Sequence, residues 1–267
     1  MCILNTVGIL VIGNEILDGV ILDTNSQWII QQLKPLNYTV AKSITVRDDI
    51  SEIAKAITRM KNDGIDLVIT TGGLGPTYDD MTLKGVAEAF SIPMKLNEEA
   101  IKIVERQYKN FHDRGVIDSA EITDARRKMA VFPEGAEPLD NMAGGAPGVF
   151  LTKEDFKVVN LPGVPSELKW IFENQLEPIL KKQAHGHYYE KIIYLNLRDE
   201  SILAPLIDEA MHADSGVYIK SMVKPYGAPG IRLWVSAHGE DIKEIKERVE
   251  KIVDFLVELT KDQVYTD

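Results

Sequence analysis

Short apolar runs alternate with amphipathic segments along the first part of the chain. Three runs rich in β-branched residues predict buried strands at residues 7–12, 38–46 and 66–70. Apolar residues at three- and four-residue spacing predict helices over residues 24–36, from Asp49 or Ser51 to just before Gly64, and over residues 80–90. Because strands and helices alternate at this spacing, we expect βαβ crossovers and a three-layer α/β fold around a mostly parallel sheet.

The same kind of pattern continues, less regularly, as far as residue 184. It predicts helices over residues 97–115, over 119–129 and from Ser166 onward, and a buried strand at residues 157–161. Pro178 is expected to kink or end the last of these helices. Together these elements predict one large domain over residues 1–184.

After residue 184 the order of elements changes. The pattern predicts a strand at residues 192–197, a helix over 200–211, strands at 217–223 and 231–237 around a turn-rich stretch, and a long amphipathic helix over 241–260. This β-α-β-β-α order predicts a smaller α+β domain over residues 185–267.

Composition narrows the class of protein. The chain has 267 residues, of which 45% are hydrophobic and 27% charged, as in ordinary globular domains. Its start does not resemble a signal peptide, and no apolar run approaches the roughly 18 residues of a membrane span. Cys2 is the only cysteine, which excludes an intramolecular disulfide. We therefore expect a cytoplasmic protein that does not associate with membranes.

Charge and histidine spacing limit the ligands. The net charge is −11, and neither predicted domain has the basic excess that nucleic-acid binding usually needs. The smaller domain is loosely similar to KH modules, but it lacks their GxxG loop, so we expect no nucleic-acid partner. Apart from His185 and His187, the histidines are not closely spaced, which disfavours a zinc enzyme.

A glycine-rich turn follows the third predicted strand. Residues 70–76 read Thr-Thr-Gly-Gly-Leu-Gly-Pro, and a predicted helix follows. Glycines let backbone N–H groups approach a ligand closely, and a helix N-terminus favours anions. The turn is neither a Walker A loop nor a complete dinucleotide fingerprint. The sequence therefore predicts a phosphate site here, with a merely structural tight turn as the alternative.

Two carboxylates, Asp79 and Asp80, stand at the mouth of this predicted anion site. They could cap the helix that follows, but a second carboxylate beside a phosphate would repel it unless a divalent cation lay between them. Asp48, at the end of the second predicted strand, could reach the same crevice or could cap its own helix. These residues predict a phosphate site that also holds a metal ion.

Two further loops are expected at the same edge of the sheet. Gly13-Asn14-Glu15 follows the first predicted strand, and Pro162-Gly163-Val164-Pro165 follows a later one. Each alone reads as an ordinary turn. Because ligands of open parallel sheets bind at the carboxyl ends of the strands, both loops are expected to line one rim.

These motifs together resemble a known family. The segment 70–77 with Asp79, Asp80 and Thr82 is similar to the signature of the molybdopterin-binding-like domain of MogA, MoaB, MoeA and gephyrin. Leucine between the glycines and the paired aspartates resemble the CinA branch in particular. Further support comes from residues 13–19, 23–26, 141–148 and 161–167, and the resemblance extends more weakly into the smaller domain.

The resemblance implies one activity, and two departures from the family make two other activities less expected. It implies metal-dependent pyrophosphatase chemistry on ADP-ribose or a similar dinucleotide, with Mg, Mn or Co as the cation. The chain lacks the C-terminal domain to which full-length CinA proteins owe nicotinamide mononucleotide deamidase activity, so that activity is not expected. Leu74 and Asp79 depart from the MogA-type turn, which disfavours molybdopterin adenylylation. The alternative is a molybdopterin- or nucleotide-binding protein that does not turn its ligand over, or one that transfers an adenylyl group. Self-association in the family implies a homo-oligomer, with a dimer favoured.

The resemblance also suggests roles for individual residues. Asp80 occupies the place of the essential carboxylate and Asp48 that of a second; both are expected to hold the cation, with Asp79 or Glu15 orienting its waters. The amides of Gly72, Gly73 and Gly75 are expected to hold the diphosphate. Lys84 either neutralises leaving-group charge or forms a surface pair with Asp80. The full set of expected ligand-binding residues is Thr71, Gly72, Gly73, Gly75, Pro76, Gly13, Glu15, Asn25, Asn141, Gly163 and Glu167.

Overall fold

The structure, a computed structural model, describes residues 5–195, 200–222, 230–260 and 264–265. The chain divides into two compact units. The larger comprises Asn5–Leu33 and Tyr38–Ala184, and the smaller comprises the residues from His185 onward together with Lys34–Asn37. Cys2 lies outside the described residues.

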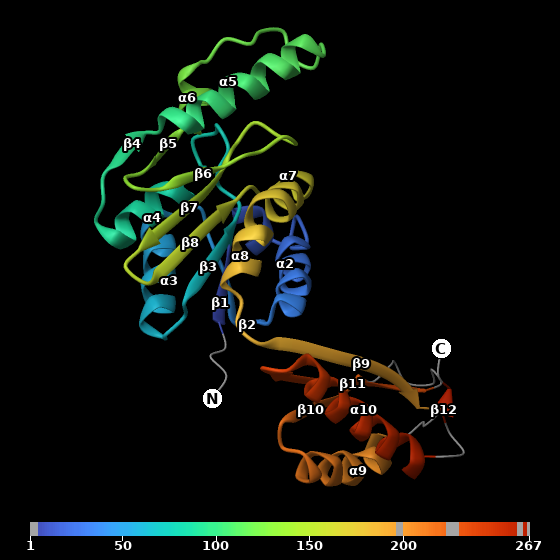
Figure 1. Cartoon of the computed structure of the whole chain (residues 1–267). Coiled ribbons are helices and arrows are strands. Elements are labelled where there is room, and N and C mark those ends of the chain that lie inside the picture. Colours follow the sequence, from blue (N-terminus) through green and yellow to red (C-terminus); the bar gives the residue numbers. More distant parts are fainter. Residues whose placement is uncertain (1–4, 196–199, 223–229, 261–263, 266–267) are drawn as a thin grey trace. The chain divides into compact units, whose positions relative to one another are not determined.

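A six-stranded, mostly parallel sheet forms the centre of the larger unit, as predicted (Figure 1). In spatial order its strands are β2 (Tyr38–Val46), β1 (Asn5–Ile12), β3 (Leu67–Thr71), β8 (Phe156–Leu161), β7 (Gly148–Lys153) and β6 (Glu137–Leu139). The first four are parallel, whereas β7 and β6 are antiparallel to their neighbours. A separate antiparallel pair joins β4 (Met94–Leu96) to β5 (Val131–Pro133).

Helices cover both faces of this sheet (Figure 1). One face carries α3 (Ile50–Asn62) and α4 (Thr82–Phe90), and the other carries α2 (Asn25–Leu33), α7 (Pro165–Ile171) and α8 (Glu177–Gln183). The remaining helices are α1 (Asn14–Leu17), α5 (Glu98–Asp113), α6 (Asp124–Lys128), the 3₁₀ turn η1 (Lys34–Leu36) and the π-helical turn η2 (Phe172–Leu176).

Successive residues of a strand face opposite sides of the sheet, and in the central strands both sides are buried beneath helices. In β1, Leu10 and Ile12 belong to the cluster beneath α3 and α4, while Ile9 and Val11 are buried but are not in that cluster. All five residues of β3 are buried, as expected for a central strand of a covered parallel sheet. The glycine turn follows this strand directly, so it starts from a fully buried element.

Several elements differ from the sequence-based expectation. The strands β4, β5, β6 and β7 were not predicted, because the short ones have no clear period and β7 follows directly on a glycine-rich loop. The helix expected over residues 119–129 is only α6, since Thr123 caps its start. Pro178 does not end the helical segment: it lies in the first turn of α8, directly after the π-helical turn η2 that interrupts the α-helix.

The smaller unit is an antiparallel sheet with two helices. Its strands, in spatial order, are β10 (Val217–Met222), β11 (Ile231–Gly239), β9 (His187–Leu195) and β12 (Val264–Tyr265), with helices α9 (Glu200–Ala213) and α10 (Ile242–Leu259). Most of the predicted turn-rich stretch between β10 and β11, residues 223–229, lies outside the described residues. Lys34 joins this unit by pairing with Glu190 at 2.6 Å and lying 4.4 Å above the Trp234 ring.

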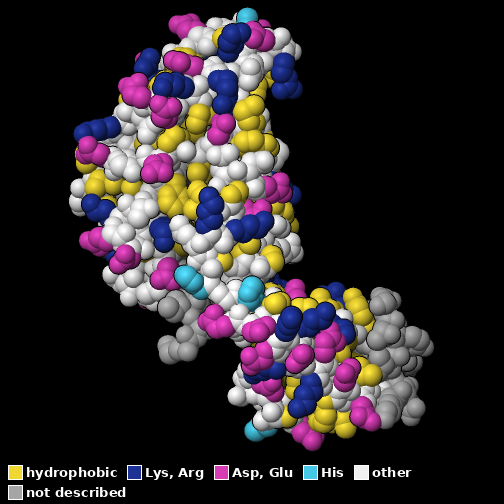
Figure 2. Space-filling model, viewed as in Figure 1, with side chains coloured by type: hydrophobic (Ala, Val, Ile, Leu, Met, Phe, Trp, Pro, Cys, Tyr) yellow, Lys and Arg dark blue, Asp and Glu magenta, His cyan; other side chains and the backbone are white. Residues whose placement is uncertain are grey.

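On the face drawn in Figure 2, Lys and Arg side chains are interspersed with Asp and Glu side chains. Among the described residues, no helix is long and apolar enough to cross a membrane.

Close packing of α3 against α4 depends on Gly85. A Cβ at this position would lie 2.5 Å from Cγ2 and 2.6 Å from Cβ of Ile53. We predict that Gly85→Ala lowers the free energy of unfolding by about 1–3 kcal/mol, because overpacking outweighs the better helix propensity of alanine. Urea unfolding measures the loss. Glu88→Ala, at an exposed position of the same helix, is the control and should change stability little; an equally stable Gly85→Ala variant would contradict the packing argument.

Candidate functional site

The carboxyl ends of the parallel strands border a cleft of about 610 Å³. Strand register places these ends together: Val11 lies opposite Thr71, Thr71 opposite Leu161, and Ile12 opposite Val46. The segments that follow β1, β2, β3 and β8 therefore meet at one edge. Of the predicted residues, Gly13, Glu15, Asn25, Asp48, Thr71, Gly72, Gly73, Gly75, Pro76, Asp79, Asp80, Gly163 and Glu167 all line the cleft.

The glycine turn is fixed by contacts that only glycine allows. Gly72 and Gly73 have φ of 102° and 65°, in the left-handed region that side chains rarely adopt. A Cβ on Gly72 would collide with the carbonyl oxygen of Ile12, and one on Gly73 with the hydroxyl of Thr82. Buried Thr82 closes the turn: its hydroxyl donates to the Gly72 carbonyl at 2.7 Å and its N–H donates to the Gly73 carbonyl at 3.2 Å.

The amides that remain for a ligand differ from the expected set. The Gly72 N–H donates to the Leu161 carbonyl at 3.0 Å, so it continues the sheet and is not available to a phosphate. The N–H groups of Gly73, Leu74 and Gly75 have no hydrogen-bond acceptor within the described part of the chain. Three consecutive amides thus remain as candidate anion donors, with Leu74 in place of Gly72.

The paired aspartates do not cap the helix that follows them. The N-cap of α4 is Met81, without a side-chain hydrogen bond. Instead, Asp80 Oδ2 accepts from the Thr77 N–H at 2.7 Å and from the Thr77 hydroxyl at 2.6 Å, and the hydroxyl also reaches Asp79 Oδ1 at 2.5 Å. The Thr77 hydroxyl lowers the pKa of Asp79, so that carboxylate stays ionised at neutral pH. The capping alternative is therefore wrong for both residues.

Asp48 faces the same carboxylates from β2. The helix after it is capped by Asp49, so the capping alternative is also wrong for Asp48. Its Oδ2 accepts from the Asn14 N–H at 2.8 Å. Burial raises the pKa of Asp48, and the carboxylates of Glu15, Asp79 and Asp80 raise it further, against the effect of the Asn14 hydrogen bond. Negative charge thus accumulates at one end of the cleft.

This accumulation fits a divalent cation. Within the described residues, none of the carboxylates of Glu15, Asp48, Asp79 and Asp80 has a Lys, Arg or His nitrogen within 4.0 Å. No three acidic, histidine or cysteine side chains in the described ranges are arranged to hold a metal by themselves. Mg²⁺ is commonly bound by one or two carboxylates plus water and substrate phosphates, and the donors here suit that mode.

Lys128 is a basic residue that contacts the segment carrying Asp79 and Asp80, and it was not predicted from the sequence. From the end of α6 its ammonium donates to the Thr77 carbonyl. Burial lowers the pKa of Lys128, as does nearby Lys84, whereas Asp80 and Asp79 act in the opposite direction. Lys84 itself is exposed, and the expected surface pair with Asp80 does not form within 4.0 Å among the described residues. Lys128 has no local sequence signal, because it lies far along the chain from the turn that it holds.

Asn25 ties three loops together. Its Nδ2 donates to Thr71 Oγ1 at 3.0 Å and to the Gly163 carbonyl at 2.8 Å. Because a carbonyl can only accept, these bonds fix which end of the amide faces the strands. Asn25 therefore positions the segments after β1, β3 and β8 relative to one another at the cleft.

Asn141 differs from the expected direct ligand contact. It is fully buried and does not line the cleft. Its Nδ2 donates to the Ala146 carbonyl and to Glu167 Oε2, both at 2.7 Å, and its Oδ1 accepts from the N–H groups of Ala143 and Gly144. All its hydrogen-bonding capacity is used within the protein, so it shapes the loop and holds Glu167.

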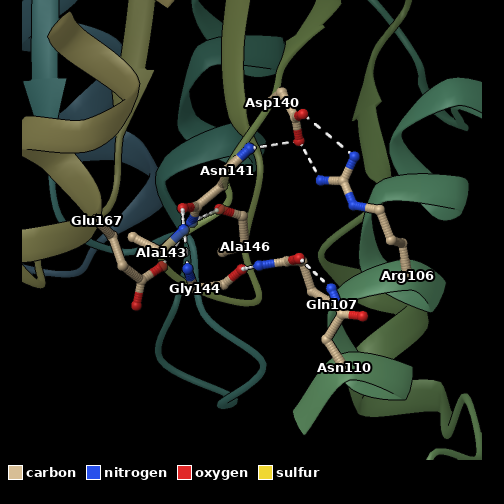
Figure 3. A network of polar contacts seen from close by, with 9 residues as sticks. All are labelled: Arg106, Gln107, Asn110, Asp140, Asn141, Ala143, Gly144, Ala146 and Glu167. Atoms are coloured by element: carbon tan, nitrogen blue, oxygen red, sulfur yellow. Dashed lines mark hydrogen bonds and ion pairs between the residues drawn. The ribbon is translucent and has the colours of Figure 1, made fainter. Parts of the chain in front are cut away.

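Figure 3 shows this network and its anchor on α5. Arg106 forms a two-point ion pair with Asp140, which in turn accepts from the Asn141 N–H at 2.7 Å. Buried Gln107 donates to the Gly144 carbonyl at 3.0 Å. The loop after β6 is thereby held against α5.

Glu167 and Tyr108 complete this end of the cleft. Burial raises the pKa of Glu167, against the effect of its Asn141 hydrogen bond. Tyr108, from α5, also lines the cleft, with the Arg126 guanidinium 4.0 Å from its ring centroid. Sequence reasoning missed Tyr108, since within α5 it reads as an ordinary helix residue.

The raised pKa of Asp48 gives a pH-dependent prediction. A carboxyl whose pKa is raised on folding destabilises the folded state once it ionises, so stability falls as the pH rises through the folded pKa. We predict that Asp48→Asn, with metal removed by chelator, raises the melting temperature at pH 7. The gain should shrink towards zero as the pH falls below about 4, because the wild-type carboxyl is then protonated and neutral, as asparagine is.

Thermal unfolding followed by circular dichroism between pH 3 and pH 8 tests this. Asp155→Asn, at an exposed turn, is the matched charge control and should show no comparable gain. A wild-type protein more stable than Asp48→Asn at pH 7 would contradict the charge accumulation described above.

Comparison with known proteins agrees with the fold and the motifs. Residues 8–182 match a family model described as "Probable molybdopterin binding domain". A protein of Pyrobaculum arsenaticum is 38% identical, covering 96% of this chain and 94% of that one, and a protein of Aeropyrum pernix is 39% identical, covering 92% and 90%. The crystal structure of CinA from Thermoplasma acidophilum is 34% identical with a TM-score of 0.59, covering 66% of this chain and 98% of that one. The chain therefore belongs to the molybdopterin-binding-like domain family, within its CinA branch.

Proposed function

We propose that this chain binds a nucleotide diphosphate in the cleft and hydrolyses its pyrophosphate bond with the help of a divalent cation. ADP-ribose or a related dinucleotide is the proposed substrate class. One observation carries the proposal: the three unpartnered amides of residues 73–75 border the same cleft as the carboxylates of Asp48, Asp79 and Asp80, which form no ion pair within 4.0 Å in the described ranges. Anion donors beside accumulated negative charge suit a phosphate ligand that arrives with a cation.

The backbone of the turn would bind and orient the diphosphate. The N–H groups of Gly73, Leu74 and Gly75 would donate to the phosphates. The hydrogen bonds from Thr82 to the Gly72 and Gly73 carbonyls fix the start of this run, so little reorganisation would be needed there on binding. The Gly72 amide takes no part, because it is hydrogen-bonded to Leu161.

The carboxylates would hold the cation and the attacking water. Asp80 is fixed by Thr77 through Oδ2, and Asp48 is fixed by Asn14 through Oδ2, which leaves one oxygen of each for the metal. The cation, proposed as Mg, Mn or Co, would polarise the phosphoryl oxygens and lower the pKa of water when bound. Asp79 and Glu15, which line the same cleft, would accept hydrogen bonds from the water molecules of the cation.

The outer part of the cleft suits a ring system. Ile21, Leu22 and Val164 line it and remain 55%, 82% and 51% exposed. Exposed apolar side chains at the rim of a polar site are available to cover the flat face of a base or a pterin. The volume of about 610 Å³ lies in the usual range for small-ligand sites.

A second candidate function is ligand binding without turnover, with a molybdopterin or a nucleotide as the ligand. Adenylyl transfer to such a ligand belongs to the same alternative. The exposed apolar rim of Ile21, Leu22 and Val164 supports this alternative, because it could bind a ring system whether or not a metal is present.

Hydrolysis assays with purified protein separate the two. We predict that ADP-ribose is cleaved only with a divalent metal, and that Asp80→Asn lowers turnover by about 10²-fold, equivalent to about 2.7 kcal/mol of transition-state stabilisation. Asp155→Asn should retain wild-type turnover.

Equilibrium binding of ADP-ribose and of molybdopterin, measured in parallel, tests the alternative that the protein only binds its ligand. Tight binding with no product would favour a binding protein, and unchanged turnover in Asp80→Asn would refute the role of that carboxylate.

A further inference from the structure

A second hollow, of about 310 Å³, lies against the glycine turn. Gly73, Leu74, Gly75, Asp80 and Met129 line both this hollow and the cleft described above. The two spaces are therefore separated by little more than the turn itself and one methionine. The second space is the reverse side of the candidate anion site.

One part of the wall of the hollow is apolar. It is formed by Leu74 from the turn, Leu83 from α4, Met94 from β4, Met129 and Val131. Leu74, Leu83 and Met129 are 6%, 9% and 4% exposed, so they are core residues whose packing leaves this space beside them. An apolar cavity of this size gains by accepting an apolar ligand.

Three cations border the same space: Lys84, Arg127 and Lys128. None of them has a carboxylate within 4.0 Å among the residues that the structure describes, although Asp80 and Asp124 also line the hollow. Lys128 donates to the Thr77 carbonyl, whereas the side chains of Lys84 and Arg127 make no hydrogen bond within the described ranges. Lys84 and Arg127 thus border an apolar space without a hydrogen bond or ion pair to another side chain in the described ranges.

We propose that this hollow is a binding site for a small amphipathic carboxylate, with one or two rings seated against the apolar wall and the carboxylate at Lys84 and Arg127. A neutral ligand would gain nothing from the two cations, whereas a carboxylate could pair with them. A polyanion such as a diphosphate would be repelled by Asp80 and Asp124 and would leave the apolar wall uncovered. This inference does not depend on the hydrolysis proposed for the front cleft.

Calorimetric titration with 2-naphthoate tests the site on the full chain. We expect saturable binding by the wild type and weaker binding of the uncharged 2-naphthamide. The double variant Lys84→Ala, Arg127→Ala should weaken 2-naphthoate binding by at least about tenfold, which corresponds to 1.4 kcal/mol. Both side chains are exposed, so the variant should fold normally.

A charge-matched control and a blocking variant complete the experiment. The double variant Arg114→Ala, Lys153→Ala removes two exposed cations elsewhere and should bind as the wild type does. Val131→Trp should fill the hollow and abolish binding, provided that its circular dichroism spectrum shows a folded protein.

Three outcomes would overturn the proposal. They are no saturable binding at millimolar 2-naphthoate, an equal loss in both double variants, or a crystal structure with 2-naphthoate in the front cleft instead. Failure of ADP-ribose hydrolysis would leave the proposal unaffected, because binding is measured directly.

Discussion

The backbone of Gly72 lies against the carbonyl of Ile12 so closely that no side chain could be accommodated there. This approach of the β3 turn to the end of β1, closed by the Thr82 hydroxyl, sets the positions of the free amides at residues 73–75. The end of β2, with Asp48, follows because it is in register with the end of β1. Any side chain at Gly72 would push the turn away from the sheet and separate the amides from the carboxylates.

A second set of contacts fixes the opposite wall of the cleft. The loop after β6 has few apolar side chains, so it is ordered by hydrogen bonds: Asn141 spans it from within, and Arg106 and Gln107 hold it against α5. These hydrogen bonds fix the conformation of the loop, because leaving a buried amide without its partners would cost free energy. Glu167 owes its orientation to Asn141, and thus indirectly to a helix about 60 residues earlier in the chain.

The ligand-free site carries an electrostatic cost that a ligand could remove. Asp48, Asp79, Asp80 and Glu15 lie near one another without a basic partner within 4.0 Å in the described ranges, and burial raises the pKa of Asp48. Ionised Asp48 therefore weakens the folded protein, and a cation bound beside it would reduce that cost. Lys128 contacts the same turn through the Thr77 carbonyl and lines the hollow behind it, together with Asp80.

The sequence by itself determined the parallel core and most of the cleft floor. Apolar periodicity located β1, β2, β3 and β8 and their helices, because long covered elements carry a clear period. The sequence also predicted the glycine turn and the carboxylates that follow the strand ends. Both could be recognised from neighbouring residues alone, without knowledge of distant contacts. The short strands β4–β6, with almost no periodic signal, were not found.

Tertiary structure alone decided which of these groups are available. The Gly72 amide bonds to Leu161, Asn141 bonds to Glu167, and Lys128 bonds to Thr77, each on another segment of the chain. Tyr108 likewise reaches the cleft from a distant helix. Whether a donor is free depends on which acceptor the folded chain brings to it, and no local pattern of residues encodes that choice.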